Sequence, residues 1–162
     1  MTPARQSVRV LFVCMGNICR SPAADIVFHH VVAEAGLTDQ VEIDSAGTIG
    51  YHAGSPPDHR MAATLKTRGY VIHGKARQVV REDLDRFDLV VAMDRDNEAE
   101  LHQLATPANR RKIHRFTGFC SRHAIADVPD PYYGGTQGFE QAVDLIEDGC
   151  AGILEHVRRL IK

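Results

Sequence analysis

A cysteine and an arginine stand six positions apart in one short run, Cys14-Met15-Gly16-Asn17-Ile18-Cys19-Arg20. A thiolate is a strong nucleophile, and a guanidinium can bind two phosphate oxygens at once. If the backbone amides of this run and the start of a following helix point at the same phosphate, their positive ends stabilise both the anion and the thiolate. We therefore expect Cys14 to be ionised near neutrality and to attack phosphorus, while Arg20 holds the phosphate oxygens.

The elements around this run are those that a phosphate-binding loop needs. Val10 to Val13 form an apolar stretch typical of a buried strand, and Gly16 and Asn17 tolerate the backbone angles of a tight turn. Ser21-Pro22 is typical of a helix start, with Ser21 as the N-cap. Cysteine, five residues and arginine is by itself a common spacing, but its place between a predicted strand and a predicted helix makes it more specific.

Phosphoryl transfer from an oxygen also needs a proton for the leaving group, so a carboxylic acid must reach the loop from elsewhere. Asp130 is the best candidate, because it lies between Pro129 and Pro131, which stiffen the backbone. Tyr132 and Tyr133 follow it and offer flat walls for an aromatic substrate. The alternative interpretation is a surface turn, since Asp-Pro and Gly-Gly are common turn formers.

Apolar segments of strand length alternate with segments of helical periodicity along the chain. This alternation predicts an α/β fold, a doubly wound four-stranded parallel sheet with helices on both faces. We expect one domain over residues 1–162, with a flexible N-terminus at residues 1–7. Ligands of such sheets bind beyond the carboxyl ends of the strands, where Cys14 lies. Predicted strands cover residues 10–13, 41–45, 89–93 and 112–116, and predicted helices cover 21–35, 58–68, 81–87, a segment capped by Asp94, and 138–160.

The composition of the chain argues against some classes of binding partner. The 162 residues carry a net charge of −2 with no basic run, so we expect neither nucleic acid nor an anionic membrane surface as a partner. The N-terminus lacks the apolar core of a signal peptide, and no apolar run is long enough to span a membrane. We expect a cytoplasmic monomer. Four cysteines in a chain of this length do not make a disulfide scaffold, so we expect reduced thiols.

We expect the other residues that could do chemistry to have structural roles. The nine histidines show no pairing with cysteine or carboxylate at metal-ligand spacing, so we expect no metal site. A glycine-rich lysine loop for a nucleotide is missing, and we expect no cofactor. Asp94 follows a predicted strand and is within reach of the phosphate pocket, but we interpret it as a helix cap.

Four segments together resemble the low-molecular-weight protein tyrosine phosphatases, and this resemblance spans most of the chain. The order of the motifs also discriminates, because in the larger, unrelated tyrosine phosphatases the acid precedes the cysteine. The matching segments are Cys14-Met15-Gly16-Asn17-Ile18-Cys19-Arg20-Ser21-Pro22, Asp44-Ser45-Ala46-Gly47-Thr48, Ala76-Arg77-Gln78 and Asp130-Pro131-Tyr132-Tyr133.

The resemblance implies a role for each matching residue. Cys14 would be the nucleophile, Arg20 the phosphate-binding residue, and Asp130 first the acid and then the base for the hydrolytic water. Asn17 would adopt a left-handed conformation inside the loop, braced by two serines. The residues implied to bind phosphate or support the loop are Met15, Gly16, Asn17, Ile18, Cys19, Ser21 and Ser45.

One position departs from the family pattern. Relatives often carry a histidine two residues before the Ala-Arg pair as a further brace for the asparagine, whereas this chain has Gly74 there and His73 one place earlier. We expect slightly looser bracing of Asn17 and no loss of chemistry.

The resemblance also implies a substrate. A bulky aliphatic residue at the position of Ile18 accompanies phosphotyrosine activity, whereas Thr there accompanies protein-arginine phosphatases. Tyr51, Tyr132 and Tyr133 would line a deep slot that phosphoserine is too short to fill. We therefore expect a phosphatase acting on protein phosphotyrosine, with a protein-arginine phosphatase as the alternative.

Cys19 is close enough in sequence to Cys14 for a disulfide across the loop, and the resemblance supports this role of reversible protection. The alternative is that Cys19 only fills space beneath the loop. An arsenate reductase of the same fold is a weaker alternative, since it needs two further cysteines near the middle of the chain, and residues 89–96 contain none. A phosphate-binding module without activity would not require Cys14, Arg20, Ser21 and Asp130 together.

Overall fold

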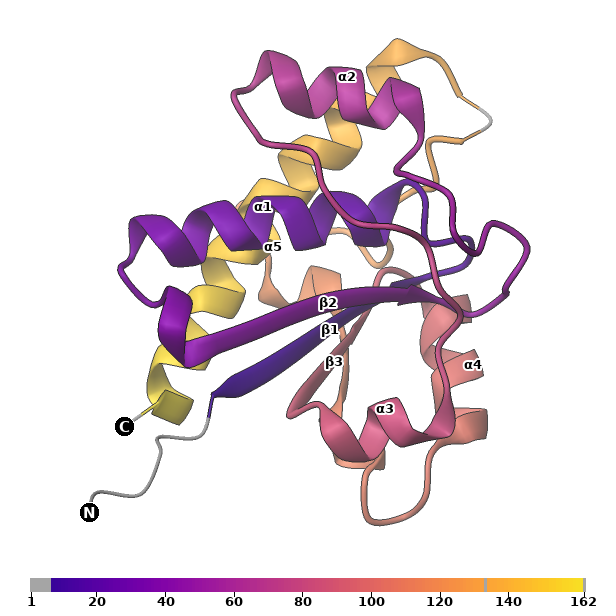
Figure 1. Ribbon diagram of the computed structural model, residues 1–162, viewed down its shortest axis with the longest axis vertical. Coiled ribbons are helices and arrows are strands. Elements are labelled where there is room, and N and C mark those ends of the chain that lie inside the picture. The colour runs from indigo at the N-terminus through magenta and orange to yellow at the C-terminus, as the bar shows by residue number, and fades with distance from the viewer. Residues whose placement is uncertain (1–6, 133, 162) are drawn as a thin grey trace.

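The computed structural model describes residues 7–132 and 134–161, so Tyr133 and nearly all of the predicted flexible segment 1–7 lie outside the described residues. Four parallel strands form one sheet in the order β2-β1-β3-β4 (Figure 1). The predicted fold class is therefore confirmed. The strands are β1 (Val8–Cys14), β2 (Val41–Gly47), β3 (Leu89–Ala92) and β4 (Ile113–Arg115).

Helices cover both faces of the sheet because its central strands are apolar on both sides. Val10 and Phe12 of β1 pack into the core cluster that contains the buried residues of α1 and α5, whereas Leu11 and Val13 pack into a second cluster. In Figure 1, α1, α2 and α5 lie on one side of the sheet, and α3 and α4 lie on the other. The helices are α1 (Arg20–Glu34), α2 (His59–Thr67), α3 (Arg81–Arg86), α4 (Arg95–Leu104) and α5 (Thr136–Ile161).

The predicted elements form within two residues of their expected ends, with three short 3-10 helices in addition, Thr38–Gln40, Arg110–Lys112 and Phe116–Phe119. Asp58 and Asp94 cap α2 and α4 by accepting backbone N–H groups. The prediction that Ser21 caps α1 is wrong, because α1 begins at Arg20 and Cys19 stands at its N-cap without a side-chain hydrogen bond. The Ser21 hydroxyl contacts Cys14 and Asn17 instead.

Backbone hydrogen bonds bring distant segments to the carboxyl end of the sheet. Cys14 at the end of β1 stands in register with Gly47 at the end of β2, and Gly47 also forms a bridge with Gln78. The N–H of Val128 donates to the carbonyl of Met93, just after β3, at 2.9 Å. These contacts place three segments, following β1, β2 and β3, around one edge of the sheet.

The long helix α5 passes very close to the 3-10 helix Phe116–Phe119. A Cβ atom on Gly152 would lie 2.0 Å from the carbonyl oxygen of Phe119, so this approach requires glycine. Gly138, in the first turn of the same helix, has nothing closer than an ordinary contact at 3.8 Å with Pro131. Although α5 spans 26 residues, none of the helices in the described part of the chain combines the length and apolarity of a membrane span.

We predict that Gly152→Ala lowers the free energy of unfolding by about 1–3 kcal/mol, because a backbone carbonyl cannot move aside as a side chain does. Gly138→Ala is the matched control: alanine favours a helix interior over glycine by about 1 kcal/mol, so its stability should be unchanged or higher. Thermal unfolding of both variants measures the difference. Equal stability of the two variants would contradict the close approach of α5.

Candidate active site

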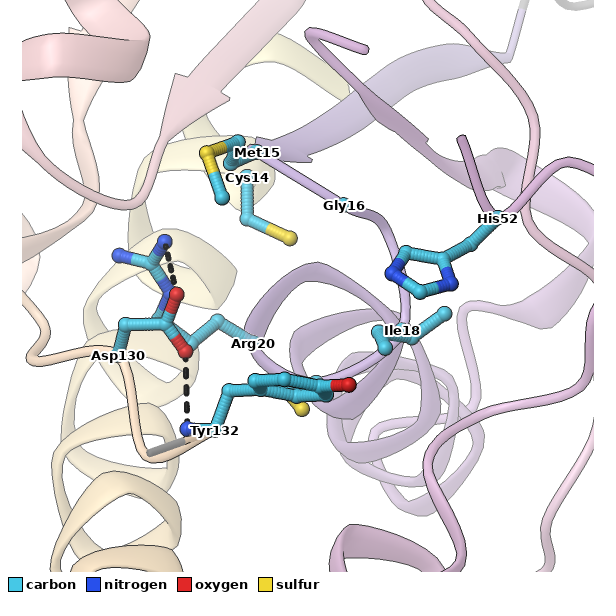
Figure 2. A pocket seen from close by; sticks show the side chains of 9 residues that line it. Cys14, Met15, Gly16, Ile18, Arg20, His52, Asp130 and Tyr132 are labelled. Atoms are coloured by element: carbon cyan, nitrogen blue, oxygen red, sulfur yellow. Dashed lines mark hydrogen bonds and ion pairs between the residues drawn. The ribbon is translucent and has the colours of Figure 1, made fainter. Parts of the chain in front are cut away.

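A pocket opens at the carboxyl end of β1, and the run from Cys14 to Arg20 forms its floor (Figure 2). Asp130 and Tyr132 contribute from the segment before α5, and His52 contributes from the turn after β2. In Figure 2 the Asp130 carboxyl group faces the Arg20 guanidinium, and Ile18 and His52 lie on the opposite side. The lining residues are Cys14, Met15, Gly16, Ile18, Cys19, Arg20, His52, Asp130 and Tyr132.

Asn17 sits buried inside the loop in the left-handed conformation, with φ of 56°. Its amide nitrogen donates to Ser21 Oγ at 2.8 Å and to Ser45 Oγ at 3.0 Å. Its amide oxygen accepts the backbone N–H of Arg77 at 3.0 Å. These contacts tie the loop to α1, to β2 and to the segment after Gly74, so the backbone of Arg77 holds Asn17 where relatives often use a histidine. His73 packs its ring against His29 instead, with ring centres 4.7 Å apart.

The loop backbone is fixed at three further points. The carbonyl of Cys14 accepts from Thr48 at 2.9 Å, and that of Met15 accepts from Ile49 at 3.1 Å. The carbonyl of Ile18 accepts the N–H of Asp58 at 2.7 Å. These bonds tie the loop carbonyls to segments outside the loop, and such contacts favour the fixed backbone that a preorganised anion site requires.

The Cys14 sulfur is buried at the bottom of the pocket and has two polar neighbours. The backbone N–H of Asn17 donates to Sγ at 3.3 Å, and Ser21 Oγ lies 3.0 Å from Sγ. The Ser21 hydroxyl has one hydrogen, and its other acceptor, the carbonyl of Ala46, is farther away at 3.4 Å. Both contacts place polar groups against the sulfur at the bottom of the pocket.

Arg20 is buried, with its guanidinium held by groups from two other segments. Nη1 donates to Asp94 Oδ2 at 2.6 Å and to the carbonyl of Val128 at 2.9 Å, and Nη2 lies 3.6 Å from Asp130 Oδ2. Burial by itself would lower the pKa of Arg20, but the neighbouring Cys14, Asp94 and Asp130 raise that pKa above its ordinary value. Arg20 is therefore a fixed cation beneath the pocket.

Asp94 has two roles, of which the sequence suggested mainly one. It caps α4 by accepting the N–H of Asn97 at 2.8 Å, as expected, and its other oxygen orients Arg20. The two roles are compatible because a carboxylate has two acceptor oxygens. The position of Asp94, just after a buried strand of a parallel sheet, was the signal for the second role.

Asp130 lies at the mouth of the pocket, where its side chain is 34% exposed. Its Oδ1 accepts the backbone N–H of Tyr132 at 3.0 Å, which orients the carboxyl group. The other oxygen, Oδ2, points toward Arg20 (Figure 2). Oδ2 would therefore lie beside a phosphate group that is bound at Arg20, near the bond between its phosphorus and the substrate oxygen.

The aromatic walls differ in part from the prediction. Tyr132 lines the pocket, and its ring carries the Arg60 guanidinium 5.2 Å above its centre. Tyr51, which we expected at the pocket rim, is 85% exposed and does not line the pocket. The next residue, His52, lines it instead, because the turn after β2 directs His52 inward and leaves Tyr51 against the outer side of the imidazole ring.

Cys19 is a buried free thiol in the pocket lining. Burial, with a smaller contribution from the charges of Asp58 and Asp130, raises the pKa of Cys19 far above its ordinary value. Cys19 is therefore a neutral thiol beneath the loop, and its disulfide with Cys14 stays a prediction. Burial also raises the pKa of Cys120 to about 11.

A single group of three metal-ligating side chains lies together in the described residues, formed by Asp25, His29 and His73. None of the three lines the pocket. The pocket lining itself brings together the Cys14 sulfur, the Arg20 guanidinium and the Asp130 carboxyl group.

Comparisons with known proteins agree with this geometry. A Bacillus subtilis protein named low molecular weight protein-tyrosine-phosphatase YfkJ is 41% identical over 94% of this chain and 97% of its own length. A crystal structure of a protein tyrosine phosphatase from Entamoeba histolytica, with Hepes in its active site, superposes with a TM-score of 0.92 at 42% identity, covering 94% of this chain and 98% of that one.

The structure of a Drosophila protein named arginine phosphatase is also similar, with a TM-score of 0.84 at 34% identity over 91% of this chain and 96% of that one. The family model described as low molecular weight phosphotyrosine protein phosphatase matches residues 9–162. The chain therefore belongs to the low molecular weight phosphotyrosine protein phosphatase family and is a phosphatase.

Proposed function

We propose that this phosphatase hydrolyses protein phosphotyrosine through a phosphocysteine intermediate on Cys14. The observation that carries the proposal is the convergence of three groups on one pocket: a hydrogen-bonded Cys14 sulfur, a buried Arg20 guanidinium and the Asp130 carboxyl group. Each has the chemical type that one part of phosphoryl transfer requires.

In the first step the Cys14 thiolate attacks phosphorus, and the bond from phosphorus to the tyrosine oxygen breaks. The electron pair of that bond goes to the oxygen, which takes a proton from the Asp130 carboxylic acid and leaves as a phenol. Arg20 and the loop amides stabilise the charge on the transferring group.

In the second step Asp130, now a carboxylate, takes a proton from water as the water oxygen attacks phosphorus. The sulfur–phosphorus bond breaks, and its electron pair returns to Cys14 as a thiolate. Ser21 Oγ, 3.0 Å from Sγ, can donate its hydrogen to the departing sulfur. Inorganic phosphate leaves, and the starting state of the enzyme is restored.

The pocket walls support an aryl phosphate as the substrate. Ile18 and Tyr132 lie near each other in the pocket lining and contribute apolar surface, and Cys14 lines the same pocket (Figure 2). A phenyl ring fits between such walls and carries its phosphate down to Cys14, whereas a phosphoserine side chain is too short to do so. Because a similar Drosophila protein is named arginine phosphatase, phosphoarginine is the alternative substrate that we propose for this chain.

Replacement of the nucleophile and of the acid should have different signatures. We predict that Cys14→Ser lowers turnover of a phosphotyrosine peptide by about 10⁴-fold or more, because no other thiolate lies in the pocket. Asp130→Ala should lower turnover of phenyl phosphate by about 10²- to 10⁴-fold. It should affect p-nitrophenyl phosphate much less, because p-nitrophenolate leaves without protonation.

Steady-state kinetics of the two variants on both aryl phosphates measure these effects. Activity that survives Cys14→Ser would exclude the phosphocysteine. An equal loss on both substrates in Asp130→Ala would exclude Asp130 as the acid.

Arg20 should depend on Asp94 for its orientation. We predict that Asp94→Asn lowers kcat by about 10- to 100-fold, because the neutral amide no longer fixes the guanidinium and a small misplacement is costly. Asparagine still caps a helix, so the melting temperature should change little. Asp96→Asn, in the exposed first turn of α4, is the matched control and should retain full kcat. Equal kcat for the two variants would show that Asp94 is only a cap.

Substrate preference should depend on Ile18. We predict that Ile18→Thr reduces kcat/KM for a phosphotyrosine peptide by about tenfold or more, because it removes apolar surface against the substrate ring. The loss for a phosphoarginine peptide should be smaller. Competition assays with the two peptides give the ratio directly, and a parent enzyme that already prefers phosphoarginine would overturn the tyrosine assignment.

A further inference from the structure

A carboxylate and two imidazoles lie together beside α1, and none of the three lines the active-site pocket. Asp25 and His29 are one turn apart on α1, and His73 comes from the segment after α2. One ligand atom from each lies within 4.8 Å of the other two. The prediction that no histidine is paired with a carboxylate at metal-ligand spacing is therefore wrong, because Asp25 and His29 have the i,i+4 spacing that places both on one helix face.

The Asp25 carboxylate is buried and incompletely satisfied. The residue is 8% exposed, and Oδ1 has no partner that meets hydrogen-bond geometry. His29 Nδ1 lies 2.7 Å from this oxygen and 2.9 Å from the backbone carbonyl of Asp25, so among the described residues the imidazole is the one side chain paired with Oδ1. A divalent cation between the carboxylate and the imidazoles would compensate the buried negative charge more fully than this single contact.

We propose that Asp25, His29 and His73 bind a Zn²⁺ ion, with water completing the coordination. One carboxylate and two imidazoles form a common set for a zinc site with an open position. Ligand atoms around tetrahedral zinc lie about 3.4 Å apart, since zinc–ligand bonds are about 2.1 Å long. Both histidines are exposed, so rotation of their side chains can close the remaining gap.

The site lies directly behind the phosphate-binding loop. Asp25 and His73 border a small recess that also reaches Asn17, Ser45 and Gly74. A zinc ion would link α1, which begins at Arg20, to the segment that leads into Arg77, whose N–H holds Asn17. The ion would thus act as a clamp between two segments that support the loop.

The direct test is a Zn²⁺ titration of the Cys14→Ser protein in competition with a chromogenic chelator. The Cys14→Ser background removes the active-site thiolate, which is itself a zinc ligand, and makes the measurement independent of catalysis. We expect one tightly bound Zn²⁺ per chain, and at least tenfold weaker binding in His73→Ala and in Asp25→Asn.

His30→Ala is the matched control. His30 lies on the same helix and pairs with Glu34, four residues on, at 3.2 Å, but this pair belongs to no group of three ligands among the described residues. The zinc affinity of the His30→Ala variant should equal that of the Cys14→Ser protein from which it is made. Parent-like affinity in His73→Ala, or an equal loss in His30→Ala, would overturn the proposal.

Thermal unfolding provides a second readout. At a Zn²⁺ concentration 100 times the dissociation constant, binding to the folded state alone should raise the folding equilibrium constant by about 100-fold. The parent should show this gain and His73→Ala should not. Because His73 is exposed, the His73→Ala variant decides the outcome even if Asp25→Asn fails to fold.

Discussion

The hydrogen bonds of one buried side chain, that of Asn17, hold the catalytic loop together. A left-handed backbone is unfavourable for most residues, and asparagine is among the few that tolerate it. Here Ser21, Ser45 and the N–H of Arg77 fix Asn17 from three separate parts of the chain. The turn at Asn17 also directs its own N–H at the Cys14 sulfur, so the same residue shapes the loop and contacts the proposed nucleophile.

The charged groups around this loop are also held by specific contacts. Arg20 is buried, and this is tolerable because its Nη1 donates to Asp94 and to the carbonyl of Val128 while its Nη2 faces Asp130. The Val128 segment continues directly to Asp130, so the contact that orients the guanidinium also places the carboxyl group over the pocket. The proposed binding and proton-transfer groups are therefore positioned by the same few contacts beyond the carboxyl ends of β1 and β3.

Much of this arrangement followed from sequence because it is local. Apolar runs buried on both sides predicted the parallel strands, and Asp94 was recognisable as a helix cap. Other features depended on backbone direction at single turns. Tyr51 and His52 are adjacent, and the turn after β2 decides which of them enters the pocket. The types of two adjacent residues do not reveal which of them points inward, because the backbone angles of the turn decide this.

By itself the sequence determined the chemistry: the thiol, the guanidinium and the loop geometry are contiguous from Cys14 to Arg20, and local propensities define a strand before them and a helix after them. Only the tertiary structure decided which distant groups complete the site. Asp94 beside Arg20, the N–H of Arg77 on Asn17, and His73 beside Asp25 are contacts between segments far apart in the chain. Such contacts result from the packing of the whole sheet and its helices, which no local pattern encodes.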